Sequence, residues 1–177
     1  TIIDFSGEVI QGDLVLTGTC KTCGSSVRRL IEKAEVSFQP AVHFTVQGLP
    51  PKKDGANSMW RKATEIPRLK ALRLAAFAAM QGSPVWESEP LSLRVRIAAS
   101  IRDGDLDTFI TGICDGLMSA HGNSPITQES WLDIPEAVRP HLAIVFRDDN
   151  RISQIVAQRI DPIDGKRFYE VEIELLR

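Results

Sequence analysis

"LSLRVRIAASIRDGDLDTFITGICDGL", residues 91–117, is the stretch of sequence that decides the fold. Its first eight residues alternate between apolar and polar side chains, which predicts a strand with one buried face and a basic outer face. Its second half places apolar residues every three or four positions, from Phe109 to Leu117. This spacing predicts a helix to about residue 120, capped by Asp105 or Asp107.

The same periodicities organise the remainder of the chain. Upstream of residue 40 we expect a strand that ends at a cysteine pair and then a short helix over residues 26–34. Downstream, an Ala-rich stretch stopped by Gly82 predicts a helix. Predicted strands cover residues 41–48, 141–146, 151–160 and 167–176, the last two as a hairpin turned by residues 161–166.

These elements predict an α+β fold, a small mixed β-sheet packed with two helices. This domain would cover residues 41–177, and residues 1–40 would form an N-terminal appendage that carries a Cys-x-x-Cys knuckle. Residues 121–140 are polar and contain prolines, so they are expected to be an insertion, either an excursion or a lid.

The composition is that of an ordinary folded protein, since 43% of the 177 residues are hydrophobic and 25% are charged. No apolar run approaches the roughly 18 residues of a membrane span. The start, TIIDFSGEVI, has neither the basic nor the apolar region of a signal peptide. Three cysteines, an odd number, do not suggest a secreted disulfide framework. We therefore expect a cytoplasmic protein without a membrane partner.

Charge is unevenly distributed, although the net charge is only −2. Ten basic residues and four acids lie from Lys52 to Arg102, whereas fourteen acids and seven basic residues follow. A basic surface beside an acidic cluster suits an enzyme that binds a polyanion and holds cations; two solvated faces are the common alternative. Trp60 either stacks on a base or anchors its loop to the core. The candidate DNA-binding residues are Lys52, Lys53, Trp60, Arg61, Lys62, Arg94, Arg96 and Arg102.

Two pairs of aspartates stand at predicted element boundaries. Asp105 and Asp107, one residue apart at a helix start, can converge on one cation, and Asp148 and Asp149 follow an apolar strand. Such carboxylates commonly hold magnesium against a phosphodiester. The alternative is structural: a helix cap, a contact with the helix dipole and a polar turn.

The same residues carry a resemblance to a known family. In order, RDGDLDTFITGICDGLM, FRDDNRISQIVAQRI and FYEVEIE resemble the RusA-type Holliday junction resolvases of bacteria and their prophages. FTVQGLPPKKDGANSMWR and LSLRVRIAAS are similar to that family's first strand with its loop and to the strand before its acidic helix. The resemblance covers about residues 41–175. It implies a homodimer that cleaves branched double-stranded DNA with Mg²⁺ or Mn²⁺, in DNA recombination and repair.

The resemblance also assigns roles to residues and reveals two departures. It implies that Asp105, Asp107 and Asp149 are catalytic and bind the metal, with Asp115 and Asp148 as further acids of the site. The family's Asn is Thr108 here, and a Lys one turn into its helix is Thr111. That Lys would stabilise negative charge in the transition state, so its loss should lower the rate, unless Arg102 or Arg151 substitutes for it.

The cysteine pair is a separate candidate. GTCKTCGSSV, residues 18–27, looks like one half of a zinc ribbon, and Cys20 and Cys23 would be two of four Zn²⁺ ligands. The other ligands would lie upstream, in a second subunit or nowhere, because Cys114 and the histidines are not spaced as a second knuckle. A redox motif is less favoured, and a plain turn is the structural alternative.

The sequence thus supports a magnesium-dependent endonuclease for branched DNA as the first hypothesis. Two alternatives from other classes stay open: a catalytically inactive DNA- or protein-binding module with the same fold, which Thr111 would favour, and a zinc-dependent interaction protein.

Overall fold

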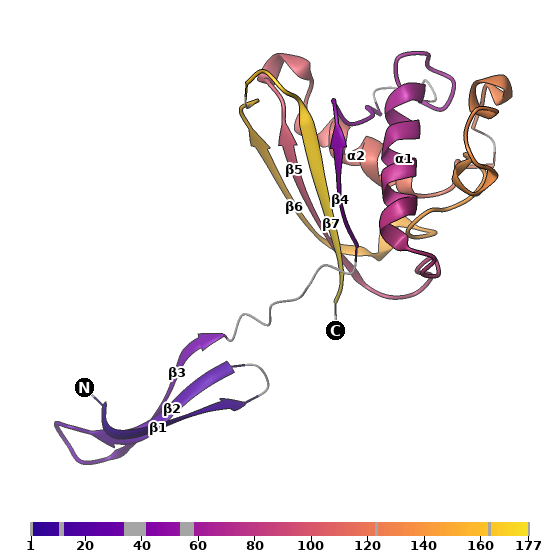
Figure 1. Cartoon of the computed structure of the whole chain (residues 1–177). Helices are drawn as coiled ribbons and strands as arrows, with labels where there is room; N and C mark the ends of the chain where they lie inside the picture. The colour runs from indigo at the N-terminus through magenta and orange to yellow at the C-terminus, as the bar shows by residue number, and fades with distance from the viewer. Residues whose placement is uncertain are drawn as a thin grey trace. The chain divides into compact units, whose positions relative to one another are not determined.

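The computed structural model of the chain describes residues 2–10, 13–33, 42–53, 59–122, 124–162 and 164–176. They belong to two compact units, Thr1–Gln39 and Pro40–Arg177. The boundary lies one residue from the one expected from the sequence. Figure 1 shows the elements of each unit.

The first unit contains an antiparallel sheet of three strands in the order β1-β2-β3. Its strands are β1 (Ile2–Ile10), β2 (Asp13–Cys20) and β3 (Ser26–Lys33). The helix predicted over residues 26–34 is therefore wrong, since β3 pairs with β2 along its length. The pairing of β3 shifts register opposite Leu14 and Val15. This irregularity breaks the strict two-residue period of a strand, so the spacing of the apolar residues resembled that of a helix.

The second unit contains a mixed sheet of four strands in the order β4-β7-β5-β6. β5 runs parallel to β6, and β7 runs antiparallel to β4 and β5. The predicted terminal hairpin is wrong, because β5 lies between β6 and β7. The strands are β4 (Val42–Gln47), β5 (Leu91–Ala98), β6 (Ile152–Ile160) and β7 (Phe168–Leu175).

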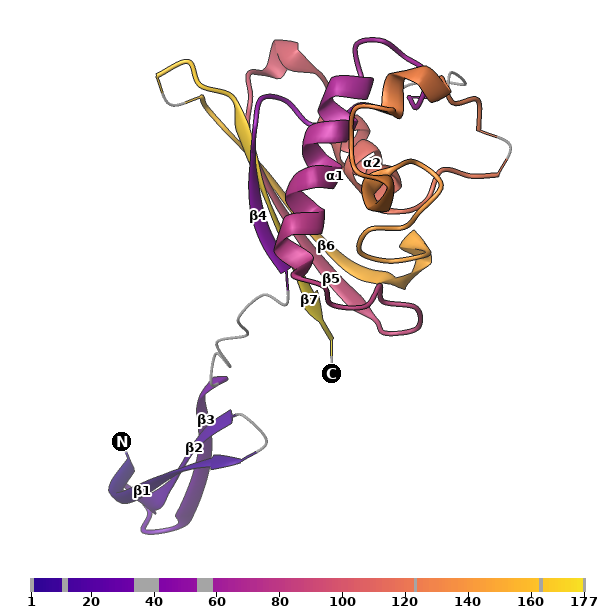
Figure 2. The ribbon, with the colours of Figure 1, turned by 45° about the vertical axis from the view of Figure 1, so that its right-hand side comes forward.

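Two α-helices of the described residues, α1 (Ile66–Met80) and α2 (Leu106–Leu117), cover one face of this sheet, as Figures 1 and 2 show. The apolar residues of β5 are buried beneath them, and Arg94 and Arg96 are exposed on the opposite face. Helix α1 ends at Gln81 and Gly82, both with positive φ, which confirms Gly82 as its stop signal. The unit is α+β, as expected.

Residues 141–146 do not form the predicted strand, although Ile144, Val145 and Phe146 are buried. Only one bridge, between Trp86 and Phe146, gives them a strand-like partner among the described residues. The backbone N–H groups of Ile144 and Val145 donate instead to the carbonyl of Leu117, at the end of α2. The backbone N–H groups of this apolar run are thus satisfied by a helix end and not by a strand, which the apolar pattern alone does not distinguish.

The insertion contains two short 3₁₀-helices, Gln128–Trp131 and Glu136–Val138. Residue 123 lies outside the described residues. The second 3₁₀-helix packs beside α1, as Figure 2 also shows.

Candidate metal and nucleic-acid site

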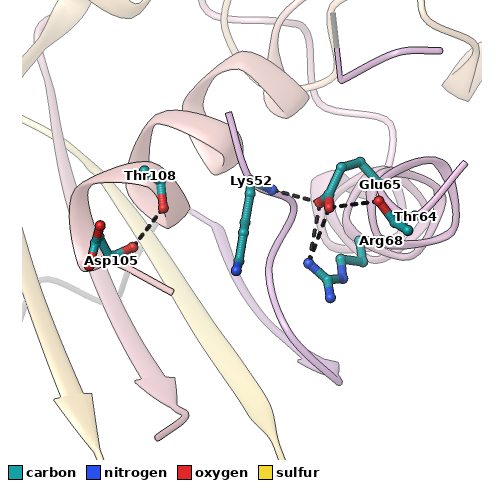
Figure 3. A network of polar contacts seen from close by, with 6 residues as sticks. All are labelled: Lys52, Thr64, Glu65, Arg68, Asp105 and Thr108. Carbon is teal, nitrogen blue, oxygen red and sulfur yellow. Dashed lines mark hydrogen bonds and ion pairs between the residues drawn. The ribbon is translucent and has the colours of Figure 1, made fainter. Parts of the chain in front are cut away.

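The N-terminus of α2 presents two of the predicted aspartates to solvent. Asp105 is the N-cap residue, yet its carboxylate makes no capping hydrogen bond to the helix. Instead, the Thr108 hydroxyl donates to the backbone carbonyl of Asp105 at 2.8 Å (Figure 3). Asp107 lies in the first turn and is exposed. Because the Asp105 carboxylate is not used as a cap, the capping alternative does not account for it.

The turn before α2 fixes the direction of the helix. The Asp103 carboxylate accepts a hydrogen bond from the N–H of Ser100 and forms an ion pair with Arg167 at 2.8 Å. Desolvation opposes the charged form of Asp103, but the Ser100 and Arg167 contacts lower the pKa of its carboxyl overall. Arg159, on β6, donates to the carbonyl of Gly104 at 2.5 Å. Asp103 therefore has a structural role, whereas Asp105 and Asp107 point outward.

One strip of α2 carries Asp107, Thr111 and Asp115. These residues are four apart, so they follow one another along the helix surface. The Thr111 hydroxyl donates to the carbonyl of Asp107 at 2.9 Å. The Asp115 carboxylate, 17% exposed, forms an ion pair with the ammonium of Lys53 at 2.5 Å. The strip therefore alternates acid, hydroxyl and a paired acid.

Lys52 and Lys53 are held against α2 by backbone packing. A Cβ atom on Gly112 would lie 2.1 Å from the carbonyl oxygen of Pro51, so only glycine lets this segment approach the helix. The N–H of Lys53 donates to the carbonyl of Thr108 at 3.2 Å. The Lys52 ammonium lies 5.3 Å from the centre of the Phe109 ring. The structure thus brings two predicted DNA-binding residues to the helix of the predicted metal ligands.

Glu65 anchors the same segment from the other side and was not predicted as a site residue. Its carboxylate is buried, 3% exposed, and accepts from the N–H of Lys52 at 2.8 Å, from Thr64 and from Arg68. Figure 3 shows Lys52 between this cluster and the start of α2. An acid just before a predicted helix was the available signal, although it indicates only a favourable contact with the dipole.

Cys114 connects the helix to the second aspartate pair. Burial raises the pKa of its thiol to about 12, and the charges of Asp149 and Asp115 add to this effect. Both carboxylates thus raise the pKa of the same thiol, although Asp115 and Asp149 are 34 positions apart in the sequence. Asp148 accepts a hydrogen bond from the N–H of Asn150 at 2.9 Å, and Asp149 is exposed.

Some predicted residues do not gather with the aspartates. Among the described residues, no group of three or more His, Cys, Asp or Glu side chains is arranged to hold a metal ion. Arg94 and Arg96 lie across the sheet from α2, and each is paired with a glutamate, at 3.1 Å to Glu172 and 3.4 Å to Glu170. The two arginines therefore do not lie beside the predicted metal ligands of α2.

Trp60 is buried and therefore does not offer a face to a base. It is 4% exposed, and its ring centre lies 5.7 Å from that of Trp131. The indole N–H of Trp131 donates to the carbonyl of Trp60 at 3.4 Å. This packing agrees with the alternative that Trp60 anchors its loop, and it corrects the expectation that the ring stacks on DNA. Of the other predicted DNA-binding residues, Arg61 and Arg102 are exposed and Lys62 is half-buried.

A buried arginine that was not predicted as a site residue organises the insertion. The Arg73 guanidinium is fully buried and donates to five backbone carbonyls at 2.5–2.9 Å. Two of these carbonyls, of Gly116 and Met118, end α2, and the other three belong to Val138, Arg139 and Leu142. The insertion is therefore anchored to α1 and to the end of α2 through its C-terminal part.

The Cys-x-x-Cys pair lies in the first unit, in the turn from β2 to β3. Cys23 is exposed and Cys20 is half-buried. The backbone N–H of Cys23, followed by that of Thr22, lowers the pKa of the Cys20 thiol to about 7. The structure thus favours a thiolate at Cys20.

Comparison with models of known protein families gives no match, and comparison with curated proteins gives none either. None of the helices among the described residues has the length and apolar character needed to cross a bilayer.

Proposed function

We propose that the chain is a metal-dependent endonuclease that cleaves phosphodiester bonds of branched DNA, as in Holliday junction resolution. The observation that carries the proposal is the acidic strip of α2, exposed at Asp107, with Lys52 and Lys53 held beside it. Carboxylates and ammonium groups side by side can bind a cation and a phosphate at one place. The resemblance to the RusA-type resolvases supports the same activity.

The donor set fits magnesium. Asp105, Asp107 and Asp149 would hold Mg²⁺ or Mn²⁺, with Asp115 and Asp148 as further acids. Magnesium prefers oxygen ligands and keeps several waters, so one or two direct carboxylates are sufficient. The absence of a capping bond at Asp105 leaves its oxygens available for this role. When bound, the metal lowers the pKa of a water ligand and polarises a phosphate.

The chain's own side chains would position the DNA around this centre. Lys53, paired with Asp115 at 2.5 Å, and Lys52, at the start of α2, would neutralise the phosphates on either side of the scissile bond. In a homodimer, two such sites related by a two-fold axis would act on two strands of one junction. We infer a homodimer for this reason.

A labelled synthetic four-way junction tests the proposal directly. We expect paired nicks at symmetric positions with Mg²⁺ or Mn²⁺, and none in the presence of a chelator, while a linear duplex of the same arm sequence stays intact. Tight binding without cutting in either metal would overturn the nuclease proposal in favour of an inactive DNA-binding module. That alternative draws support from the lack of a three-acid group among the described residues.

Thr111 stands where the RusA-type family has a Lys, and we expect Lys53 to take over the role of that Lys. Both positions border Asp115, so a cation at either one faces the same phosphate region. Lys53→Met should lower the cleavage rate about tenfold, or about 1.4 kcal/mol of transition-state stabilisation. Adding Thr111→Lys to that variant should restore most of the rate.

Single-turnover cleavage of the junction measures this effect. Lys166→Met, which removes an exposed lysine between β6 and β7, is the matched control and should change the rate less than twofold. Failure of Thr111→Lys to rescue Lys53→Met would refute the shared role, because a lysine needed only for packing or for overall charge would not be replaced from the helix.

A further inference from the structure

The turn that carries Cys20 and Cys23 is built around the first sulfur. The N–H of Cys20 donates to the carbonyl of Ser25, and the N–H of Gly24 donates to the carbonyl of Cys20, both at 2.9 Å. These two bonds close the chain into a tight loop at the end of β2. Both sulfurs therefore lie on one short loop, three positions apart, which is the spacing of a metal-binding cysteine knuckle.

Gly24 gives the turn the backbone shape that this arrangement requires. Its φ is +71°, a value that residues with a Cβ rarely adopt, and no atom lies within 4 Å of the place where a Cβ would be. The glycine is therefore needed for conformation and not for space. Its position directly after Cys23 brings the chain back to β3, with Cys23 exposed and Cys20 half-buried.

Residues 1–39 supply two ligands of a four-ligand site. Cys20 and Cys23 are the only cysteines among residues 1–39, and there is no histidine in that range. Cys114, the third cysteine, is 5% exposed in the core of the second unit, so it cannot serve as a ligand without opening that core. Structural zinc sites are almost always tetrahedral, with four protein ligands. Two sulfurs therefore make half a site.

We propose that the Cys20–Cys23 turn is one half of a tetrathiolate zinc site, and that the same turn of a second copy of the chain supplies the other half. Two identical turns related by a two-fold axis provide four thiolates in two symmetry-related pairs, which is the isologous contact that a symmetric dimer makes. The site is independent of the proposed nuclease chemistry and uses no residue of it.

Charge supports this pairing. Four thiolates around Zn²⁺ leave a net charge of −2, by simple addition. Lys21 lies between the two cysteines and is exposed, so two copies of the turn bring two ammonium groups to the rim of the site. Each would offset one negative charge. A disulfide within the turn would make no use of this arrangement.

Cobalt substitution in the full chain tests the proposal. The protein would be purified under reducing conditions, stripped with a chelator, and titrated with Co²⁺, which fills zinc sites and reports its ligands in the visible and near-ultraviolet spectrum. We expect an intense thiolate-to-cobalt charge-transfer band that saturates at one Co²⁺ per two chains, the spectrum of tetrahedral four-sulfur coordination, and displacement of this cobalt by Zn²⁺ in the same ratio.

Matched variants separate this site from the other groups of the chain. Cys20→Ser combined with Cys23→Ser should remove the charge-transfer band, whereas Cys114→Ser and Asp107→Asn should keep both the band and the stoichiometry. Saturation of the thiolate band at one Co²⁺ per chain, a spectrum with fewer than four sulfurs, or no thiolate band at all would each overturn the proposal. If the chain cuts junctions but has no thiolate metal site, only the zinc proposal fails. If it has the thiolate site but does not cut junctions, only the proposed nuclease function fails.

Discussion

Junction cutting by Asp107→Asn is expected to fall by about three orders of magnitude, while binding of the junction is retained. A metal ion that neutralises charge in phosphodiester cleavage supplies several kcal/mol, and a loss of about 4 kcal/mol corresponds to a factor of about a thousand. Asparagine keeps the shape of the side chain and one oxygen but removes its charge. Asp107 is exposed in the first turn of α2, so the change disturbs no packed group.

The same substitution should hardly affect stability, which separates a catalytic role from a structural one. Removing a negative charge from the first turn costs about 0.3–1 kcal/mol through the helix dipole. The hydrogen bond from Thr111 goes to the backbone carbonyl of Asp107 and is unaffected. Single-turnover cleavage, filter binding and urea unfolding measure the three quantities. Asp161→Asn, which changes an exposed acid after β6, is the control. If Asp107→Asn cut the junction as fast as Asp161→Asn does, a metal-binding role for Asp107 would be excluded.

The strand and helix of residues 91–117 were predictable because each has one face in the core and one face in solvent. β5 buries alternate residues and exposes Arg94 and Arg96, and α2 buries an apolar stripe that includes Phe109 and Leu117. In a half-buried element the apolar residues recur with the period of that element, so a single sequence is sufficient to predict it. The exposure of Asp105 and Asp107 follows from the same period.

Partners distant in sequence could not be predicted, because no local pattern records them. The insertion of β5 between β6 and β7 depends on which strand edges pair, and the turn of residues 161–166 is compatible with a hairpin or with a crossing over one strand. Likewise, Lys53 and Asp115 meet because Gly112 admits the backbone of Pro51, and only the fold reveals this contact.

Arg73→Leu is expected to lower the free energy of unfolding by about 4 kcal/mol or more. Leucine would leave five buried carbonyl oxygens without their donor, and hydrogen bonds from a charged group contribute about 1.5–3 kcal/mol each. Burial lowers the pKa of Arg73 to about 9, so the guanidinium stays charged at neutral pH. Its charge faces the negative end of the α2 dipole and lies 5.3 Å from the Trp60 ring.

Urea unfolding followed by circular dichroism measures this loss, and Arg73→Lys keeps it measurable if the leucine variant does not fold. Lysine retains the charge but has three donors on one atom, so it cannot span carbonyls on both α2 and the insertion, and about half of the loss should remain. Arg147→Leu is the control, because its ion pair with Glu87 is 69% and 63% exposed and should contribute less than about 1 kcal/mol. If Arg73→Leu were no more destabilising than Arg147→Leu, the insertion would be held by its apolar contacts alone, and Arg73 would be a tolerated buried charge and not the anchor of this fold.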